Sequence, residues 1–247
     1  MQLSNHMPYV ITQAFPLTQE EQRKDILPDR LWLPVQVTDT CPLIVRVTNG
    51  EDVSQELERL TEEGFAVYTW YADQTAAERD LSACAILQEK LEQQLDLLLQ
   101  EHPVLDAQRV FVDGWLSAYL IFHTQRFKAA IQRPALINPT TAYGNCTAGW
   151  VEPFGDSLEE MMLTLAERSV LRDVDACKTP CLVLWSEETL RYSREQSEEL
   201  YAAMKDRNPD VVCRMAVFTK AQWEKHGLRE IVAWWERFSV EEGGGTR

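Results

Sequence analysis

Short β-rich runs alternate with amphipathic helical runs from residue 31 almost to residue 239, and few folds accommodate this pattern. Strands separated by helices are joined by right-handed crossovers, so they lie parallel in one sheet. A parallel sheet has to be covered on both faces. The alternation therefore predicts an α/β fold, a three-layer sandwich whose mainly parallel sheet has about seven strands with helices on both faces.

Residues 31–239 are expected to form a single domain, preceded by a polar N-terminal arm (1–30) and followed by a disordered tail (240–247). The chain has 247 residues, of which 45% are hydrophobic, and this is enough for one large core. The first two strand-like runs, 31–37 and 43–48, flank a short polar turn. We therefore expect the sheet to open with a hairpin.

Later segments predict a strand at 109–114, a helix at 117–132 and a strand at 135–139 that ends at a proline. Trp234 and Trp235 fall on the last helix, about 100° apart around its axis. At least one of these indoles should therefore face away from the core, where it could contact another chain.

The formal net charge is −15, from 39 acidic and 24 basic residues. Such a chain repels phosphate backbones and acidic membrane surfaces, so we expect neither nucleic acid nor a membrane among its partners. Its N-terminus has no basic start followed by an apolar segment, and no apolar run approaches the roughly 18 residues of a membrane span. These features predict a soluble, cytoplasmic protein that binds proteins or small molecules.

Among the six cysteines, only Cys177 and Cys181 lie close in sequence. No second pair and no nearby histidine completes a zinc site, so we expect free thiols, no metal and no cofactor. Cys146 is a further candidate nucleophile. Its surroundings offer no cation to lower the thiol pKa, and a structural role is therefore expected.

Residues 109–119, RVFVDGWLSAY, have the form of a strand that enters a tight turn and then a helix. In a nucleophile elbow the apex residue is exposed, and the positions two before and two after it are small. Here Leu116 is the apex, between Gly114 and Ala118. The turn is present without a nucleophile. Ligands of such sheets bind at the carboxyl ends of the strands, which places the site on the loops after residues 48, 71, 113, 139, 185 and 218.

The order of elements, the elbow, the segment CLVLWSEETLRYS and the final FTKAQWEKHGLREIVAWWERF together resemble the α/β-hydrolase fold. Residues 105–240 look most like the catalytic domain of prolyl-oligopeptidase-type serine peptidases, in the acylaminoacyl-peptidase branch and its dienelactone-hydrolase-like relatives. Over 31–104 the resemblance is one of topology only.

The resemblance implies a catalytic serine at Leu116, an acid at Thr189 and a histidine base at Trp223. None of these side chains can perform the implied step. The segment at Asn49 and Gly50 also departs from the His-Gly-Gly oxyanion loop common in such enzymes. The resemblance with these substitutions implies a non-catalytic protein that acts by binding, as a subunit, scaffold or regulator of another protein or as a homodimer.

An active esterase or peptidase-like enzyme remains an alternative, because Ser117, Glu188 and His226 follow the chain order of the fold's catalytic triad. If Ser117 were the apex, however, Trp115 and Tyr119 would occupy the positions that must be small, and their rings would collide with the strand and helix beside the turn. The sterics favour Leu116 as the apex.

Large apolar groups gather at the expected site: Trp115, Leu116, Trp185 and Trp223. Exposed, they would form a partner surface or a site for a small apolar ligand; buried, they would fill the cavity. The filled cavity is the simpler interpretation, and a carrier of a small apolar ligand is the third hypothesis.

Overall fold

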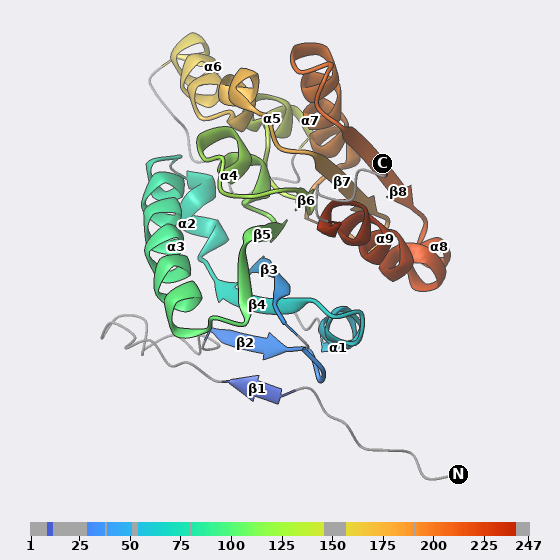
Figure 1. Cartoon of the computed structure of the whole chain (residues 1–247). Helices are drawn as coiled ribbons and strands as arrows, with labels where there is room; N and C mark the ends of the chain where they lie inside the picture. The colour runs from blue at the N-terminus through green and yellow to red at the C-terminus, as the bar shows by residue number, and fades with distance from the viewer. Residues whose placement is uncertain are drawn as a thin grey trace.

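In the computed structural model, the described residues are 9–11, 29–37, 39–50, 54–79, 81–145, 157–189 and 191–240. They form one sheet of eight strands in the order β1-β2-β4-β3-β5-β6-β7-β8, with helices on both faces (Figure 1). The strands are β1 (Tyr9–Ile11), β2 (Arg30–Leu33), β3 (Cys41–Thr48), β4 (Ala66–Tyr71), β5 (Leu105–Gly114), β6 (Ala130–Gln132), β7 (Cys181–Ser186) and β8 (Cys213–Phe218).

The helices connect these strands in the predicted alternation. They are α1 (Ser54–Glu62), α2 (Gln74–Arg79), α3 (Leu81–Glu101), α4 (Ser117–His123), α5 (Pro139–Asn145), α6 (Leu158–Glu167), the 3₁₀ helix η2 (Val170–Ala176), α7 (Arg194–Arg207), α8 (Lys220–Gln222), the π-helix η3 (Trp223–Gly227) and α9 (Leu228–Ser239). From β4 across β3 and β5 to β8 all neighbouring strands are parallel, whereas β1 pairs with β2, and β2 with β4, in antiparallel fashion. The predicted three-layer, mainly parallel sandwich is confirmed.

The hairpin expected at the start of the sheet is wrong. β2 pairs with β4, whereas β3 lies between β4 and β5. The cause is burial: seven of the eight residues of β3 are buried, so this strand needs cover on both faces and a central place in the sheet. β1, inside the expected N-terminal arm, adds an edge strand to β2.

The long helix expected at 117–132 is also wrong. α4 ends at His123, because Thr124 turns to an extended conformation with φ −139° and ψ 152°. Three residues of the same run form β6, which is fully buried between β5 and β7. A strand this short leaves too weak a pattern to be separated from the apolar face of the preceding helix.

The strand expected at 135–139 is absent from the structure. Residues 135–138 form neither strand nor helix, and Pro139 opens α5. Proline is favoured at a first helical position because its missing N–H needs no partner there. The backbone N–H groups of Ile137 and Asn138 donate to Oε1 of Gln196, at 2.9 Å and 2.8 Å, which takes the place of strand pairing.

Two hydrophobic cores lie on the two sides of the sheet. One contains side chains of α3, α4 and α7, and the other contains side chains of α1 and α9 (Figure 1). Trp234 and Trp235 are 1% and 0% exposed, so the expectation that one of them faces away from the core is wrong. Trp235 packs on Phe111 with ring centroids 5.3 Å apart, and Trp234 packs on Phe238 at 4.7 Å. The buried stripe of α9 is wide enough to hold both indoles.

Within the described part of the chain, we find no helix with the length and apolar character needed to cross a membrane. The described cysteines are all free and buried; they are Cys41, Cys84, Cys177, Cys181 and Cys213. Burial raises the pKa of Cys177 to about 11 and that of Cys213 to about 12, so these thiols stay protonated near neutral pH. Cys146 and residues 241–247 of the tail expected at 240–247 lie outside the described residues.

Candidate functional site at the carboxyl edge of the sheet

The turn after β5 depends on a glycine. Gly114 has φ +148°, and a Cβ at this position would lie 2.3 Å from the backbone O of Val47 in β3. Any side chain here would collide with the neighbouring strand, and an L-residue rarely adopts this φ. Ala118, two residues beyond the apex, is 1% exposed. Close packing on both sides of the turn therefore demands small residues.

Leu116 caps α4 in an ordinary conformation, with φ −90° and ψ −4°. Among the described non-glycine residues none has a positive φ, so no left-handed strain is stored at this apex. The side chain is 2% exposed and belongs to the hydrophobic core that contains α3 and α4. A nucleophile has to face the substrate, whereas this side chain points into the protein.

Gln132, at the end of β6, holds the turn in place. Its Oε1 accepts a hydrogen bond from the backbone N–H of Ala118 at 2.6 Å, and its Nε2 donates to the backbone O of Trp115 at 2.9 Å. The residue is 2% exposed. Sequence reasoning assigned it to a helix and missed this role. A single polar side chain at the end of an apolar run was the signal that could have revealed it.

The structure does not bring Ser117, Glu188 and His226 together. Ser117 is fully buried, and its hydroxyl has no hydrogen-bond partner. Glu188 is 40% exposed and pairs with Nζ of Lys220 at 3.1 Å, while His226 lies on the exposed side of η3. No hydrogen bond or ion pair joins any two of these three residues, all of which lie in described segments. In this geometry a general base cannot reach the serine.

A cavity of about 450 Å³ opens at the carboxyl edge, lined by residues that follow β3, β5, β6, β7 and β8. Five residues that the sequence placed at the site line it: Asn49, Trp115, Trp185, Thr189 and Trp223. Glu188 lines it too. Gly50 is not among the lining residues, and Leu116 and Ala118 instead line a separate hollow of about 30 Å³ beside α2 and α3. The cavity is therefore open, although the filled cavity was the simpler expectation.

Arg46 and Arg133 line the floor of this cavity and belong to a largely buried cluster of four charges, hereafter the ion cluster: Arg46, Glu56, Asp113 and Arg133. Nη2 of Arg46 lies 2.8 Å from Oδ2 of Asp113, and Nε of Arg133 lies 2.7 Å from Oδ1 of the same carboxylate. Glu56 pairs with both guanidinium groups. The two positive and two negative charges balance, which is what allows them to be buried.

The ion cluster shifts the pKa values of its members. Burial favours the neutral form of Glu56, but the Arg133 and Arg46 guanidiniums outweigh it and lower the carboxyl pKa. Burial likewise opposes the charge of Arg133, yet Asp113 and Glu56 raise its pKa above the usual value. Sequence reasoning missed this cluster. Its signal was Arg46 inside the apolar run LIVRVT and Asp113 after the apolar run in RVFVDG.

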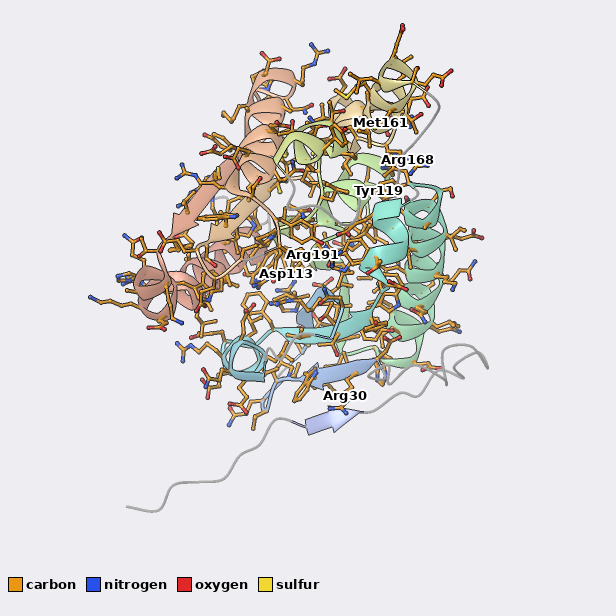
Figure 2. All side chains as sticks on the ribbon, turned by 180° about the vertical axis from the view of Figure 1, so that it is seen from behind. Arg30, Asp113, Tyr119, Met161, Arg168 and Arg191 are labelled. Atoms are coloured by element: carbon orange, nitrogen blue, oxygen red, sulfur yellow. The ribbon has the colours of Figure 1, made fainter. Side chains whose placement is uncertain are left out.

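The ion pairs at the rim of the cavity are more exposed to solvent than those of the ion cluster. Nη2 of Arg191 lies 2.6 Å from Oε2 of Glu78 in α2, and the Tyr192 hydroxyl donates to the same carboxylate. Burial raises the pKa of Glu78 despite these partners. Figure 2 labels Asp113, in β5, and Arg191, which follows β7. The cavity thus has a fixed, buried floor beneath a rim that is partly exposed.

Among the described residues that line the cavity, no serine or threonine hydroxyl is hydrogen-bonded to a histidine or a carboxylate. Guanidinium groups and indoles line the cavity, and these groups hold hydrogen-bond acceptors and flat rings. Among the described residues no group of three or more His, Cys, Asp or Glu side chains is placed to hold a metal ion.

The chain is similar to known proteins in sequence and in structure. No family model matches the chain. It is 30% identical over 123 residues to the uncharacterized peptidase YuxL of Bacillus subtilis (strain 168), a match that covers 46% of this chain and 18% of that protein.

Solved structures match over nearly the whole chain. The Pyrococcus horikoshii acylaminoacyl peptidase is 18% identical with a TM-score of 0.72, over 98% of this chain and 43% of that one. A Mycobacterium tuberculosis puromycin-hydrolyzing peptidase is 18% identical with a TM-score of 0.60, over 90% and 39%. A putative dienelactone hydrolase from Klebsiella pneumoniae subsp. pneumoniae MGH 78578 is 14% identical with a TM-score of 0.57, over 85% and 93%.

The chain thus spans less than half the length of YuxL and of the two peptidases. At these identities the structural matches establish the fold alone. The chain has the α/β-hydrolase fold, and it resembles acylaminoacyl peptidase, puromycin-hydrolyzing peptidase and dienelactone hydrolase structures.

Proposed function

We propose that this chain is a non-catalytic α/β-hydrolase-fold protein that acts by binding, as a subunit, scaffold or regulator of another protein or through its own dimer. The observation that supports this most is the buried, unstrained Leu116 at the apex of the turn after β5. Acyl transfer begins with attack by an activated nucleophile, and a hydrocarbon side chain offers none.

The two loops that would supply an acid and a base support the same proposal. Thr189 carries no charge to orient an imidazole, and its backbone N–H is bound to the O of Ser186 at 2.9 Å. Trp223 packs edge-on against Phe218 with ring centroids 5.6 Å apart, as part of the cavity wall. Neither side chain can exchange a proton with substrate near neutral pH.

The peptidases that this chain resembles suggest the alternative of an active serine hydrolase. That alternative requires Ser117 to leave a fully buried position and His226 to turn inward from the surface. No observation favours such a rearrangement. The proposal also places the protein in the cytoplasm, because five free, buried cysteines suit a reducing compartment.

Ester turnover tests the proposal. We expect purified protein to hydrolyse p-nitrophenyl acetate no faster than the Ser117→Ala and His226→Ala variants do, since any residual rate comes from surface groups common to all three. Turnover by the unaltered chain that either substitution abolishes would contradict the proposal. Native mass spectrometry of the same protein, isolated from its own cells, should show a bound protein partner, a dimer or a small ligand.

A small-ligand carrier is the second candidate. The open cavity of about 450 Å³ favours it, because binding sites for small molecules are commonly concave and of this size.

A further inference from the structure

Four charged side chains line the cavity, and each of them is already paired with an opposite charge: Arg46, Arg133, Arg191 and Glu188. The first two belong to the ion cluster, whose positive and negative charges balance. At the rim, Nη2 of Arg191 lies 2.6 Å from Oε2 of Glu78, and Glu188 lies 3.1 Å from Nζ of Lys220. A ligand ion of either sign would leave water without meeting a free counter-charge, which disfavours a charged ligand.

The walls of the cavity are mainly aromatic and apolar. The lining includes three partly buried indoles and three smaller apolar residues: Trp115, Trp185, Trp223, Val47, Pro134 and Leu184. The Trp185 ring is fixed because its Nε1 donates to the backbone O of Tyr192 at 3.2 Å, and Trp223 is held against Phe218. Rings that are already ordered bind a planar group with little further loss of side-chain entropy. The walls therefore favour a flat, apolar ring system.

Two uncharged polar groups on the lining remain available to a ligand. They are the hydroxyls of Ser186 and Thr189, which belong to partly buried residues and are hydrogen-bonded to no other residue in the described part of the chain. A hydroxyl can donate or accept a hydrogen bond, so it suits a neutral polar substituent. The volume of about 450 Å³ is near the lower end of the range for small-molecule sites, which suits a ligand of one or two rings.

We infer that this cavity is a binding site for a small, uncharged, planar aromatic molecule, with its rings against the indoles and any polar substituent toward the two hydroxyls. The inference rests on the proposed function, because it gives a non-hydrolysing chain its ligand class. It also narrows the small apolar ligand expected from the sequence, where the indoles were visible but the pairing of the charges was not.

Calorimetric titration of the full chain tests the charge of the ligand with three probes of the same ring: 2-naphthalenemethanol, 2-naphthoate and 2-naphthylmethylammonium. We expect the alcohol to bind at one site and both ions to bind at least about tenfold more weakly, because each ion would lose its hydration without gaining a counter-charge. An ion that binds as tightly as the alcohol, or no binding of the alcohol, would overturn the inference.

A saturated probe tests the planar shape of the ligand. Decahydro-2-naphthalenemethanol has the carbon skeleton and the hydroxyl of 2-naphthalenemethanol but no flat π-system, so it should bind about fivefold more weakly. Equal affinities of the two alcohols would mean that the cavity selects only for apolar surface, and this result would overturn the assignment of a planar aromatic ligand.

A substitution in the wall tests the contact with the indoles. Trp223→Leu keeps an apolar side chain but removes the ring, so 2-naphthalenemethanol should bind about fivefold more weakly. Trp32→Leu is the matched control, because Trp32 is also partly buried and packs against the same hydrophobic core as Trp223 but lies outside the cavity lining. Equal effects of the two substitutions would overturn the assigned contact.

Methyl 2-naphthoate, an uncharged planar ester, separates this inference from the proposed function. Binding of the ester and its recovery intact agree with both. Conversion to 2-naphthoate that Ser117→Ala abolishes would contradict the non-catalytic proposal and leave the ligand class standing. Binding of neither the ester nor the alcohol, with the ester recovered intact, would remove the ligand class and leave the non-catalytic proposal standing.

Discussion

The turn after β5 and the loops after β7 and β8 meet at the same edge of the sheet, yet they are built in opposite ways. The turn is closed: Leu116 and Ser117 are 2% and 0% exposed, and Gln132 binds the backbone on both sides of them. The loops are open, with Glu188 40% exposed and His226 at the surface. In a serine hydrolase these regions have to converge on one substrate.

The comparison shows that packing alone requires the shape of the turn after β5, whereas a reaction would also require an acid and a base in the two loops. The elbow shape follows from the contact between Gly114 and Val47, and this contact is needed whether or not a nucleophile stands at the apex. The loop after β8 also has a close contact, since a Cβ at Gly227 would lie 2.6 Å from the Trp223 ring, but this contact holds an indole and neither an acid nor a base. A chain can therefore keep the form of an active site without its reaction, and the elbow pattern alone does not establish catalysis.

Gly114→Ala, in the closed turn after β5, should have the largest effect on the free energy of unfolding. A Cβ at 2.3 Å from Val47 O, at φ +148°, should cost about 4 kcal/mol in the free energy of unfolding or prevent folding. Gly64→Ala is the control, since Gly64 has φ +87° but nothing within 4 Å of the added Cβ; it should cost about 1 kcal/mol. Urea unfolding measures both. Equal losses would mean that the close approach to β3 does not set the turn.

Asp113→Asn tests the ion cluster beneath the cavity. The substitution keeps the shape but leaves two buried guanidiniums with one carboxylate, so the free energy of unfolding should fall by about 3 kcal/mol. Asp175→Asn removes an exposed carboxylate that pairs with Arg207 and should leave urea unfolding unchanged. A similar small effect at both positions would show that the cluster is solvated rather than buried.

Glu56 and Glu78 should give opposite pH dependences, because their pKa values are shifted in opposite directions. The lowered pKa of Glu56 means that its ionised form stabilises the fold above the ordinary value of 4.5, and this stabilisation is lost as the pH falls through the folded-state pKa. The raised pKa of Glu78 means that the fold loses stability as the pH rises from 4.5 through that pKa.

Relative to the unaltered chain, Glu56→Gln should therefore become less stable as the pH rises, and Glu78→Gln should become more stable. Urea unfolding of the three proteins measures the two slopes, between about pH 2 and pH 4.5 for Glu56→Gln and between about pH 4.5 and pH 7 for Glu78→Gln. Slopes of the same sign would contradict the opposite pKa shifts of Glu56, in the ion cluster, and Glu78, at the rim of the cavity.

Lys220→Met should have the smallest effect. Its partner Glu188 is 40% exposed, and exposed ion pairs contribute little to stability. The thermal midpoint should stay within about 2 °C of that of the unaltered chain, at both low and high salt. A larger, salt-dependent shift would indicate that the loop after β7 is held as firmly as the turn after β5.

Much of the fold followed from the sequence because it depends on local patterns. The alternation of runs predicted the layers and the carboxyl edge, and the spacing of Gly114 and Ala118 predicted a crowded turn. The errors arose where tertiary contacts decide. β3 lies at the centre of the sheet instead of forming the expected hairpin with β2, because both its faces are buried. β6 is too short for its sequence to be distinguished from the apolar run around it.

The site was predicted only in part for a related reason. The indoles could be placed at the carboxyl edge because they follow strand ends. The pairing of Arg46 with Asp113 depends on the register between β3 and β5, which brings these two positions opposite one another. A single strand read alone shows a charged residue in an apolar run and does not name its partner. The ion cluster therefore emerged only from the folded chain.

The central claim is that nothing at this edge of the sheet attacks an acyl group, and active-site labelling tests it most directly. The full chain is treated with a fluorophosphonate beside an active serine hydrolase, and the intact mass of each protein is measured. The account predicts no adduct on this chain while the active enzyme is fully labelled. One stoichiometric adduct that disappears in Ser117→Ala would contradict it.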